Sequence, residues 1–390
     1  MRAARILAAA QAAACLAALS CQSVPGPPVP PRAADAPAGA RNPFAVPPAA
    51  NHQIAVSLDL TAAQQIVDAL SKSSFDPADL ERIKQLPAVS MTIADAAREA
   101  GAFDRDFEAA FDTEAKPAIY DLRGVRDNAA KWKTLLATLE ARREEIARAA
   151  AQRAAALLPA EPPVSVRLNV LASFGLAGMA DSLLVPAEPD SDGTLIVDLS
   201  RTLGEFAQES DETRIGRLLR VMAVDAFREA WSAYRQASPA WRTRDSSLGA
   251  MEPLLRVVAE AGPVALTTID EAFFPLSVWL REPGSRSIGE VNRLAERLSE
   301  GEEDLQKRVE MQSEIKKQDF ARRTAGPAGA FLADGILQSS GIEGLRTALR
   351  NGPKAFFAAY IAAAQKDRNL IPLSPAIEEQ IQGAASTPAP

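Results

Sequence analysis

The side chains that most often carry out chemistry in proteins are scarce in this sequence of 390 residues. Histidine occurs once, as His52, and the two cysteines, Cys15 and Cys21, both lie near the N-terminus. One histidine cannot build a histidine-rich zinc site, and these cysteines cannot form a metal cluster or a disulfide framework in the body of the protein. Catalysis there would therefore have to rely on carboxylates, hydroxyls, lysine or arginine.

Serine hydroxyls are present without the neighbours that usually activate them. Ser246–Ser247 and Ser339–Ser340 lie in no recognisable nucleophile elbow, and without a nearby histidine a Ser-His-Asp triad is unavailable. A serine–lysine dyad stays open, although no Ser-x-x-Lys stands in a suitable context. The stretch from Gly326 lacks the preceding strand and the following Lys-Ser/Thr of a phosphate-binding loop, so we expect no nucleotide binding.

Three segments in the second half share their order and their placement of glycine and aromatic residues with a known family. They span residues 215–231, 257–266 and 326–336, and the third continues to residues 356–360. Taken together, they resemble zinc-dependent peptidases of the gluzincin type, over roughly residues 164–365. The resemblance implies a zincin-like scaffold, with a zinc-binding helix in the first segment, a glutamate ligand in the second and a C-terminal helix pair in the third.

In that family the first helix carries the motif His-Glu-x-x-His. Two histidines four residues apart lie on one face of a helix and bind zinc together, while the glutamate takes a proton from the metal-bound water. Aligned on the apolar run before Phe227, the motif in this chain reads Val224, Asp225, Ala226, Phe227 and Arg228.

The resemblance thus implies that both histidine ligands have been lost. Val224 has no donor atom, and the permanent positive charge of Arg228 repels a divalent cation. Asp225 keeps a carboxylate at the general-base position, and Glu260 keeps one at the position of the third ligand. Two carboxylates cannot replace two imidazoles without further ligands. We therefore expect no metal, no other cofactor and no intact catalytic residue.

Arg228 suggests how such a scaffold could fold without its metal. Our hypothesis is that the guanidinium occupies the vacated space and pairs with Glu260, with Asp225 or with both, which would neutralise carboxylates that are costly to bury alone. The alternative is that Arg228 and Asp225 only face solvent on an amphipathic helix.

Aromatic residues follow the degenerate motif. Trp231, Tyr234 and Trp241 could line a cleft for a peptide or glycan, but such a cluster is more often core packing. Phe273–Phe274 and Trp279 are expected to close the core under the helix of Glu260.

The N-terminus has the pattern of an export signal. Arg2 and Arg5 precede an apolar stretch over residues 6–19, which is too short to span a membrane, so residues 1–20 are interpreted as a signal peptide. The small residues before Cys21 resemble the lipobox of bacterial lipoproteins, which implies cleavage before Cys21 and its acylation. Ordinary secretion without a lipid is the alternative.

A tether is predicted to follow the anchor. Residues 21–50 are rich in proline and alanine and contain little that could pack. The resemblance to lipoproteins implies attachment to the cell envelope, facing the periplasm. Gln22, where aspartate often marks retention in the inner membrane, favours the outer membrane.

The body is expected to be α+β and predominantly α-helical, with an N-terminal helical subdomain over 51–158, the degenerate peptidase-like domain over 159–370 and a tail over 371–390. Thr61, Asp76 and Thr92 are candidate N-caps, and Asp127 opens the longest helical pattern. Alternation over 164–170 and an apolar run over 195–199 predict two strands, and the chain is helical again from Arg214 to about Lys366.

The charge distribution narrows the possible partners. The formal net charge is −7 and no basic run stands out beyond the first residues, so we expect no nucleic-acid binding.

The sequence favours a non-catalytic binding or structural lipoprotein that contacts the membrane through its lipid and holds a peptide or envelope protein. A hydrolase with an atypical carboxylate site at Asp225 and Glu260, or an unrelated helical envelope scaffold, are the alternatives. The mixed-charge segment from Glu300 to Lys317 is a solvated helix face or a partner-binding arm.

Overall fold

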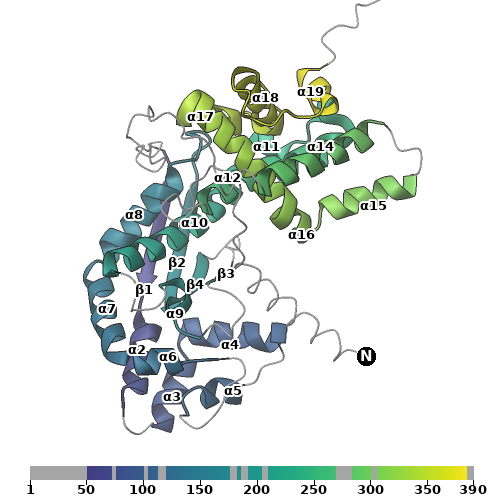
Figure 1. The fold of residues 1–390 in the computed structure, drawn as a ribbon. Coiled ribbons are helices and arrows are strands. Elements are labelled where there is room, and N and C mark those ends of the chain that lie inside the picture. The colour runs from purple at the N-terminus through teal and green to yellow at the C-terminus, as the bar shows by residue number, and fades with distance from the viewer. Residues whose placement is uncertain are drawn as a thin grey trace, which may run out of the picture. The chain divides into compact units, whose positions relative to one another are not determined.

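A computed structural model describes residues 51–72, 76–100, 104–112, 120–175, 182–185, 192–203, 210–268, 283–300 and 305–383. The predicted signal peptide, Cys21 and the tether lie outside these residues, as do Phe273–Phe274 and Trp279. The described chain is mostly helical around one small sheet, which confirms the α+β class (Figure 1). None of the described helices is long and apolar enough to cross a membrane.

Four strands form the sheet, in the order β1-β2-β4-β3. The predicted strands are β2 (Ser165–Ser173) and β4 (Gly193–Asp198), which run parallel to each other. Two further strands were not predicted: β1 (Gln53–Asp59), which runs parallel to β2, and the short edge strand β3 (Ser182–Val185), which is antiparallel to β4. In β1 every second residue is exposed, as expected for a strand with one buried face.

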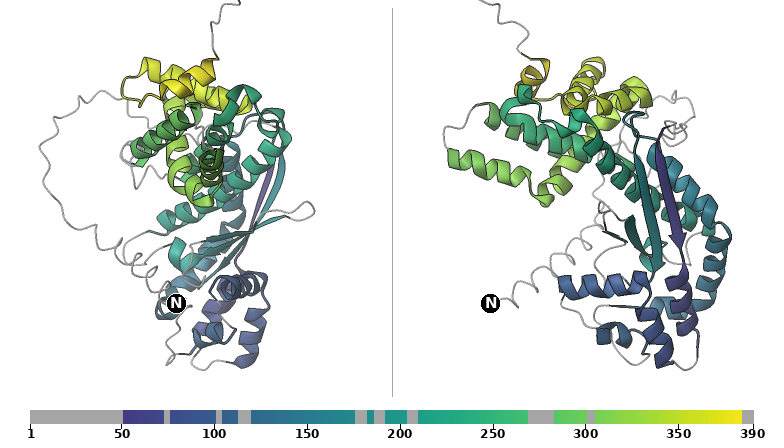
Figure 2. Two further views of the ribbon diagram at one scale, coloured as in Figure 1. Left: turned by 90° about the vertical axis from the view of Figure 1, so that its right-hand side faces the viewer. Right: turned by 180° about the vertical axis from the view of Figure 1, so that it is seen from behind.

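One face of the sheet is apolar and is covered by two helices. Val166, Leu168 and Val170 are buried, while the intervening Arg167 is exposed. Helix α8 (Arg143–Ala155) packs on β1, α10 (Asp211–Ala237) packs on β2, and the two helices contact each other (Figures 1 and 2). This packing places α10, which carries the segment aligned above with His-Glu-x-x-His, directly on the sheet.

The expected boundary near residue 158 separates two strands that are neighbours in the sheet. Gln53 of β1 lies opposite Ser165 of β2, and buried side chains from both sides of the boundary belong to one continuous core. His52 strengthens this junction, because its ring contacts Pro159 O at 2.7 Å and accepts a hydrogen bond from the Val164 N–H at 3.2 Å. Both nitrogens of the single histidine therefore hold the backbone together.

Of the three N-caps predicted for the N-terminal helices, the structure confirms one, Asp76. Asp76 caps its helix as expected, since its carboxylate accepts a hydrogen bond from the Ala78 N–H at 2.9 Å. Thr61 is instead the first residue of its helix, which Leu60 precedes, and Thr92 lies inside a helix that already begins at Pro87. The helices are α2 (Thr61–Leu70), α3 (Pro77–Lys84), α4 (Pro87–Ala100), α5 (Asp104–Ala109), α6 (Arg123–Asp127), α7 (Ala129–Ala141) and α8.

Two further expectations need correction. Asp127 ends α6 rather than opening a long helix, and the predicted helix after it is divided into α7 and α8 at Arg142. The segment expected to be a tail contains a helix, α19 (Pro375–Gln382), whose Ile377 and Ile381 are buried. This helix has only eight residues, so its apolar pattern is short, although Pro375 at its first position is a helix start signal.

Most of the C-terminal helices pack on one another around α12 (Glu252–Thr268) and α17 (Gly326–Arg350), as Figure 2 shows. Helix α18 (Gly352–Lys366) packs on α17, and α19 packs on α14 (Ser285–Ser299) and α18. The others are α9 (Leu199–Thr202), α11 (Pro239–Arg242), α15 (Leu305–Ile315), α16 (Gln318–Phe320), a 3-10 turn (Ser246–Met251) and a π-helical turn (Ala321–Ala325). The predicted helical block from Arg214 to Lys366 is thus confirmed over its described residues.

Candidate degenerate metal centre

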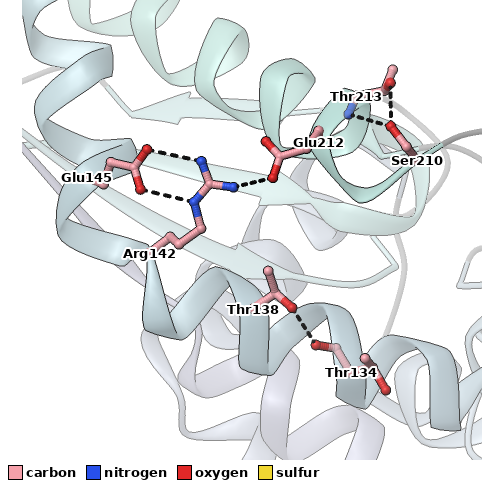
Figure 3. A network of polar contacts seen from close by, with 7 residues as sticks. All are labelled: Thr134, Thr138, Arg142, Glu145, Ser210, Glu212 and Thr213. Carbon is pink, nitrogen blue, oxygen red and sulfur yellow. Dashed lines mark hydrogen bonds and ion pairs between the residues drawn. The ribbon is translucent and has the colours of Figure 1, made fainter.

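Helix α10 is held at its start by charges from its own first turn and from α7 and α8. Ser210 caps the helix by accepting the Thr213 N–H at 3.3 Å. Arg142, at the junction of α7 and α8, binds Glu145 through two hydrogen bonds of 3.0 Å and Glu212 through one of 2.6 Å (Figure 3). This network positions the N-terminal end of α10 against α8.

Asp225 and Arg228 form an ion pair one turn apart on α10. The Asp225 side chain is only 5% exposed, whereas the Arg228 side chain is 45% exposed. Burial raises the pKa of the Asp225 carboxyl; the Arg228 charge acts against this rise and Glu229 adds to it. The Asp225 half of the pairing hypothesis is therefore correct, and Arg228 acts as the countercharge of a buried carboxylate.

Glu260 has a different partner from the one expected. Its carboxylate lies 2.7 Å from Nη1 of Arg235, and its backbone carbonyl accepts a hydrogen bond of 2.9 Å from Nε1 of Trp231. The Arg235 guanidinium also lies over the Trp231 ring, 6.0 Å from its centroid. Helices α10 and α12 thus do meet, but they meet at Trp231 and Arg235, which lie about 4.5 Å and about 10.5 Å along the helix axis from Arg228.

The residues at the four degenerate positions do not fit a zinc ion. Val224 offers no ligand, while Asp225 of α10 and Glu260 of α12 are each neutralised by a different arginine, Arg228 and Arg235. Within the described ranges, no group of three or more histidine, cysteine, aspartate or glutamate residues could hold a metal. The geometry supports ion-paired carboxylates rather than a metal-activated water.

The aromatic residues after the motif belong to the core. Trp231, Tyr234 and Trp241 are each no more than 3% exposed. Trp231 stacks on Tyr234 at 5.5 Å and meets Trp241 edge-on at 5.0 Å between ring centroids. Core packing is therefore confirmed and the cleft interpretation is wrong, because no face of these rings is available to a ligand.

The second and third segments of the resemblance are in close contact. Gly262 of α12 and Gly329 of α17 face each other so closely that a Cβ atom added at Gly329 would lie 2.2 Å from the Val258 carbonyl oxygen. A Cβ added at Gly262 would lie 2.5 Å from the Gly329 carbonyl oxygen. The small residues noted in the sequence thus allow two helix backbones to touch.

Ser247 and Lys354 are in contact, but their hydrogen bonds stabilise the local fold and do not form a catalytic dyad. The Ser247 hydroxyl donates to Asp245 Oδ1 at 2.6 Å, and Lys354 Nζ donates to Ser247 Oγ at 3.0 Å. Asp245 also caps the 3-10 turn through the Ser247 N–H. The Ser247 hydroxyl is directed at Asp245 and not at Lys354, so this contact does not have the geometry of a serine activated by a lysine.

Comparison with known proteins supports the peptidase resemblance in part of the chain. Residues 265–369 match the family described as "Putative zinc dependent peptidase (DUF5700)". The match runs from the end of α12 through α17 and α18, and it leaves Glu260 and all of α10 outside. No curated protein and no solved structure matches the chain. The chain is therefore similar to this family in its C-terminal helical region.

Replacing Arg228 should lower the stability of the protein, because the buried carboxylate of Asp225 would lose its ion-pair partner. In an Arg228→Met variant the carboxylate would lose its countercharge, so we expect the free energy of unfolding at pH 7 to fall by about 1–2 kcal/mol, less than for a fully buried pair. Because burial already raises the folded-state pKa of Asp225, stability should decline as the pH rises from about 4 through that raised pKa. Urea unfolding between pH 4 and 7 measures both effects.

The control is Asp225→Asn combined with Arg228→Met, which removes the buried charge as well as its partner. This double variant should recover most of the lost stability and lose the added pH dependence. Equal stability of the wild type and Arg228→Met at pH 7 would mean that the ion pair contributes nothing.

Proposed function

We propose that this protein is an exported cell-envelope lipoprotein whose peptidase-like scaffold has a binding or structural role instead of a catalytic one. The observation that carries the proposal is the pairing of each remaining carboxylate, Asp225 and Glu260, with an arginine. A guanidinium supplies a permanent positive charge that satisfies the carboxylate without polarising a water or a carbonyl as a metal would.

The active-hydrolase alternative is disfavoured by the same contacts. A general base must be free to take a proton, but the Asp225 carboxylate is buried and engaged by Arg228. Glu260 would have to leave Arg235 before it could bind a metal. These contacts support a scaffold that folds without a metal.

An extended peptide is the ligand that the sheet would suit best. In the described chain, the outer edge of β3 pairs with no further strand, and an exposed edge can add a peptide through backbone hydrogen bonds. Val185 of β3 lies opposite Thr194, next to Gly193, where a Cβ atom would lie 3.5 Å from Glu229 Cγ. This contact places β4 beside Glu229 of α10, and a peptide added to β3 would bind on the side of β3 away from β4.

The function is tested by incubating the purified full chain with unstructured peptides, with and without a chelator. We expect no cleavage in either condition. Cleavage that the chelator abolishes, and that Glu260→Ala also abolishes, would contradict a non-catalytic role and support the carboxylate-site hydrolase instead. Circular dichroism of the Glu260→Ala variant would show whether it still folds.

The lipid anchor is tested separately. In a bacterial host, a Cys21→Ser variant should move from the membrane fraction to the soluble envelope fraction, because the residue to be acylated is gone. Cys15→Ser is the matched control and should stay in the membrane fraction. Retention of both variants at the membrane would contradict anchoring through Cys21.

A further inference from the structure

We propose that an open cavity between α2, α3 and α7 binds an organic phosphate through Lys72, Arg82 and Lys133. The cavity has a volume of about 410 Å³, and small-molecule sites usually measure about 300–1,000 Å³. Helix α2 contacts both α3 and α7 (Figure 1). None of the residues that line the cavity belongs to α10 or to the region that matches the peptidase family.

The lining of the cavity has an excess of positive charge, although the net charge of the protein is −7. Its cationic side chains are Lys72, Arg82 and Lys133, and its carboxylates are Asp68 and Asp79. The three cations come from different elements, because Lys72 follows α2, Arg82 lies in α3 and Lys133 lies in α7. The arrangement therefore favours an anionic ligand that several elements contact together.

Hydrogen-bond donors in this lining outnumber the acceptors that satisfy them. Lys72 and Arg82 share the single carboxylate of Asp79, so two cations have one countercharge. Arg82 donates to Asp79 through Nη2 alone, and in the described part of the chain its Nε and Nη1 have no hydrogen-bond partner. The Lys72 and Arg82 side chains are 51% and 64% exposed, so a ligand can reach their remaining N–H groups.

Lys133 can exchange its present partner for a ligand. Its Nζ lies 2.9 Å from Asp68 Oδ1, and the two side chains are 48% and 64% exposed. Exposed ion pairs of this kind stabilise a protein by only about 0–1 kcal/mol. An incoming anion could therefore displace Asp68 from Lys133 at little cost.

The donors suit a phosphate better than a carboxylate. A tetrahedral phosphate monoester has three terminal oxygens for three cations, whereas a carboxylate has two oxygens in one plane. Arginine binds phosphate through paired N–H donors, and lysine binds it as a point charge. The cavity is much larger than one phosphate group, and the buried Ala69 and Ile83 in its lining offer apolar surface to a carbon skeleton. A phosphate ester, free or as a lipid headgroup, therefore fits.

Calorimetric titration of the full chain with glycerol 3-phosphate at low ionic strength tests the site. We expect saturable binding, and Arg82→Gln or Lys133→Gln should each weaken it about tenfold, because a charge-assisted hydrogen bond is lost. Asp68→Asn should tighten binding, since Lys133 would be released from its ion pair. Lys131→Gln is the matched control: Lys131 is exposed on α7 but does not line the cavity, so its replacement should leave the affinity unchanged.

Phosphatidylcholine vesicles with and without phosphatidic acid distinguish the two sources of the phosphate ester. This arm uses the Cys21→Ser chain, which cannot be acylated. Binding that depends on phosphatidic acid and on Arg82 would identify a lipid headgroup, and binding of glycerol 3-phosphate alone would identify a free ester. Absence of binding to both probes, equal binding of acetate, or an equal loss of affinity in Lys131→Gln would overturn the proposal. Circular dichroism checks that each variant folds.

Discussion

Replacing Gly329 by alanine should destabilise the protein by about 3 kcal/mol or more, at the upper end of what overpacking costs. The new methyl group would lie 2.2 Å from the Val258 carbonyl oxygen and 2.6 Å from the Gly262 Cα. Both are backbone atoms of α12, so neither can turn aside as a side chain could. The two helices would have to separate, and the cavities opened along the interface of α12 and α17 would add to the cost.

The measurement is the free energy of unfolding from urea titration, with Gly216→Ala as the matched control. Gly216 is an exposed glycine of α10 with open space at its Cβ position. Alanine there should stabilise the protein by up to about 1 kcal/mol, because glycine has the lower helix propensity. Tolerance of Gly329→Ala would mean that the helices do not approach each other so closely.

Replacing Trp231 by alanine should also cost about 3–5 kcal/mol. The side chain is 1% exposed, contacts the rings of Tyr234 and Trp241, and donates the hydrogen bond that ties α10 to the Glu260 carbonyl. Its loss would leave a large cavity and an unpaired buried carbonyl. Because this contact sets the level at which α12 meets α10, the ion pair of Glu260 with Arg235 should weaken as well.

Two further variants, one at Trp231 and one at the adjacent Ser232, separate the loss of the hydrogen bond from the loss of core packing. Trp231→Phe keeps an aromatic ring but removes the indole N–H, so we expect a smaller loss of about 1–2 kcal/mol. Ser232→Ala changes the adjacent position without altering the core and should be close to neutral. A loss below about 1 kcal/mol for Trp231→Ala would contradict the described packing.

Local signals in the sequence predicted local structure well. Asp76 caps α3 because its short carboxylate reaches the second N–H of the helix, a contact that depends only on neighbouring residues. The alternation in β2 was readable because one face of that strand is fully buried. Strand β1 was missed although it has the same alternation, with Ile54, Val56 and Leu58 on its less exposed face, because it directly follows the proline-rich segment and was not separated from it.

The candidate site could not be predicted in the same way. The close approach of α12 and α17 at Gly262 and Gly329 was not predicted, because the sequence shows two small residues but not that they face each other. The pairing of Glu260 with Arg235 depends on the level at which two helices meet, and no local pattern encodes that level.

The most direct test of the central claim is the zinc content of the purified full chain, measured by elemental analysis after dialysis against metal-free buffer. If Arg228 and Arg235 have taken over the neutralisation of Asp225 and Glu260, the protein should hold well under about one-tenth of an equivalent of zinc. One tightly bound equivalent that disappears in the Glu260→Ala variant would contradict the account.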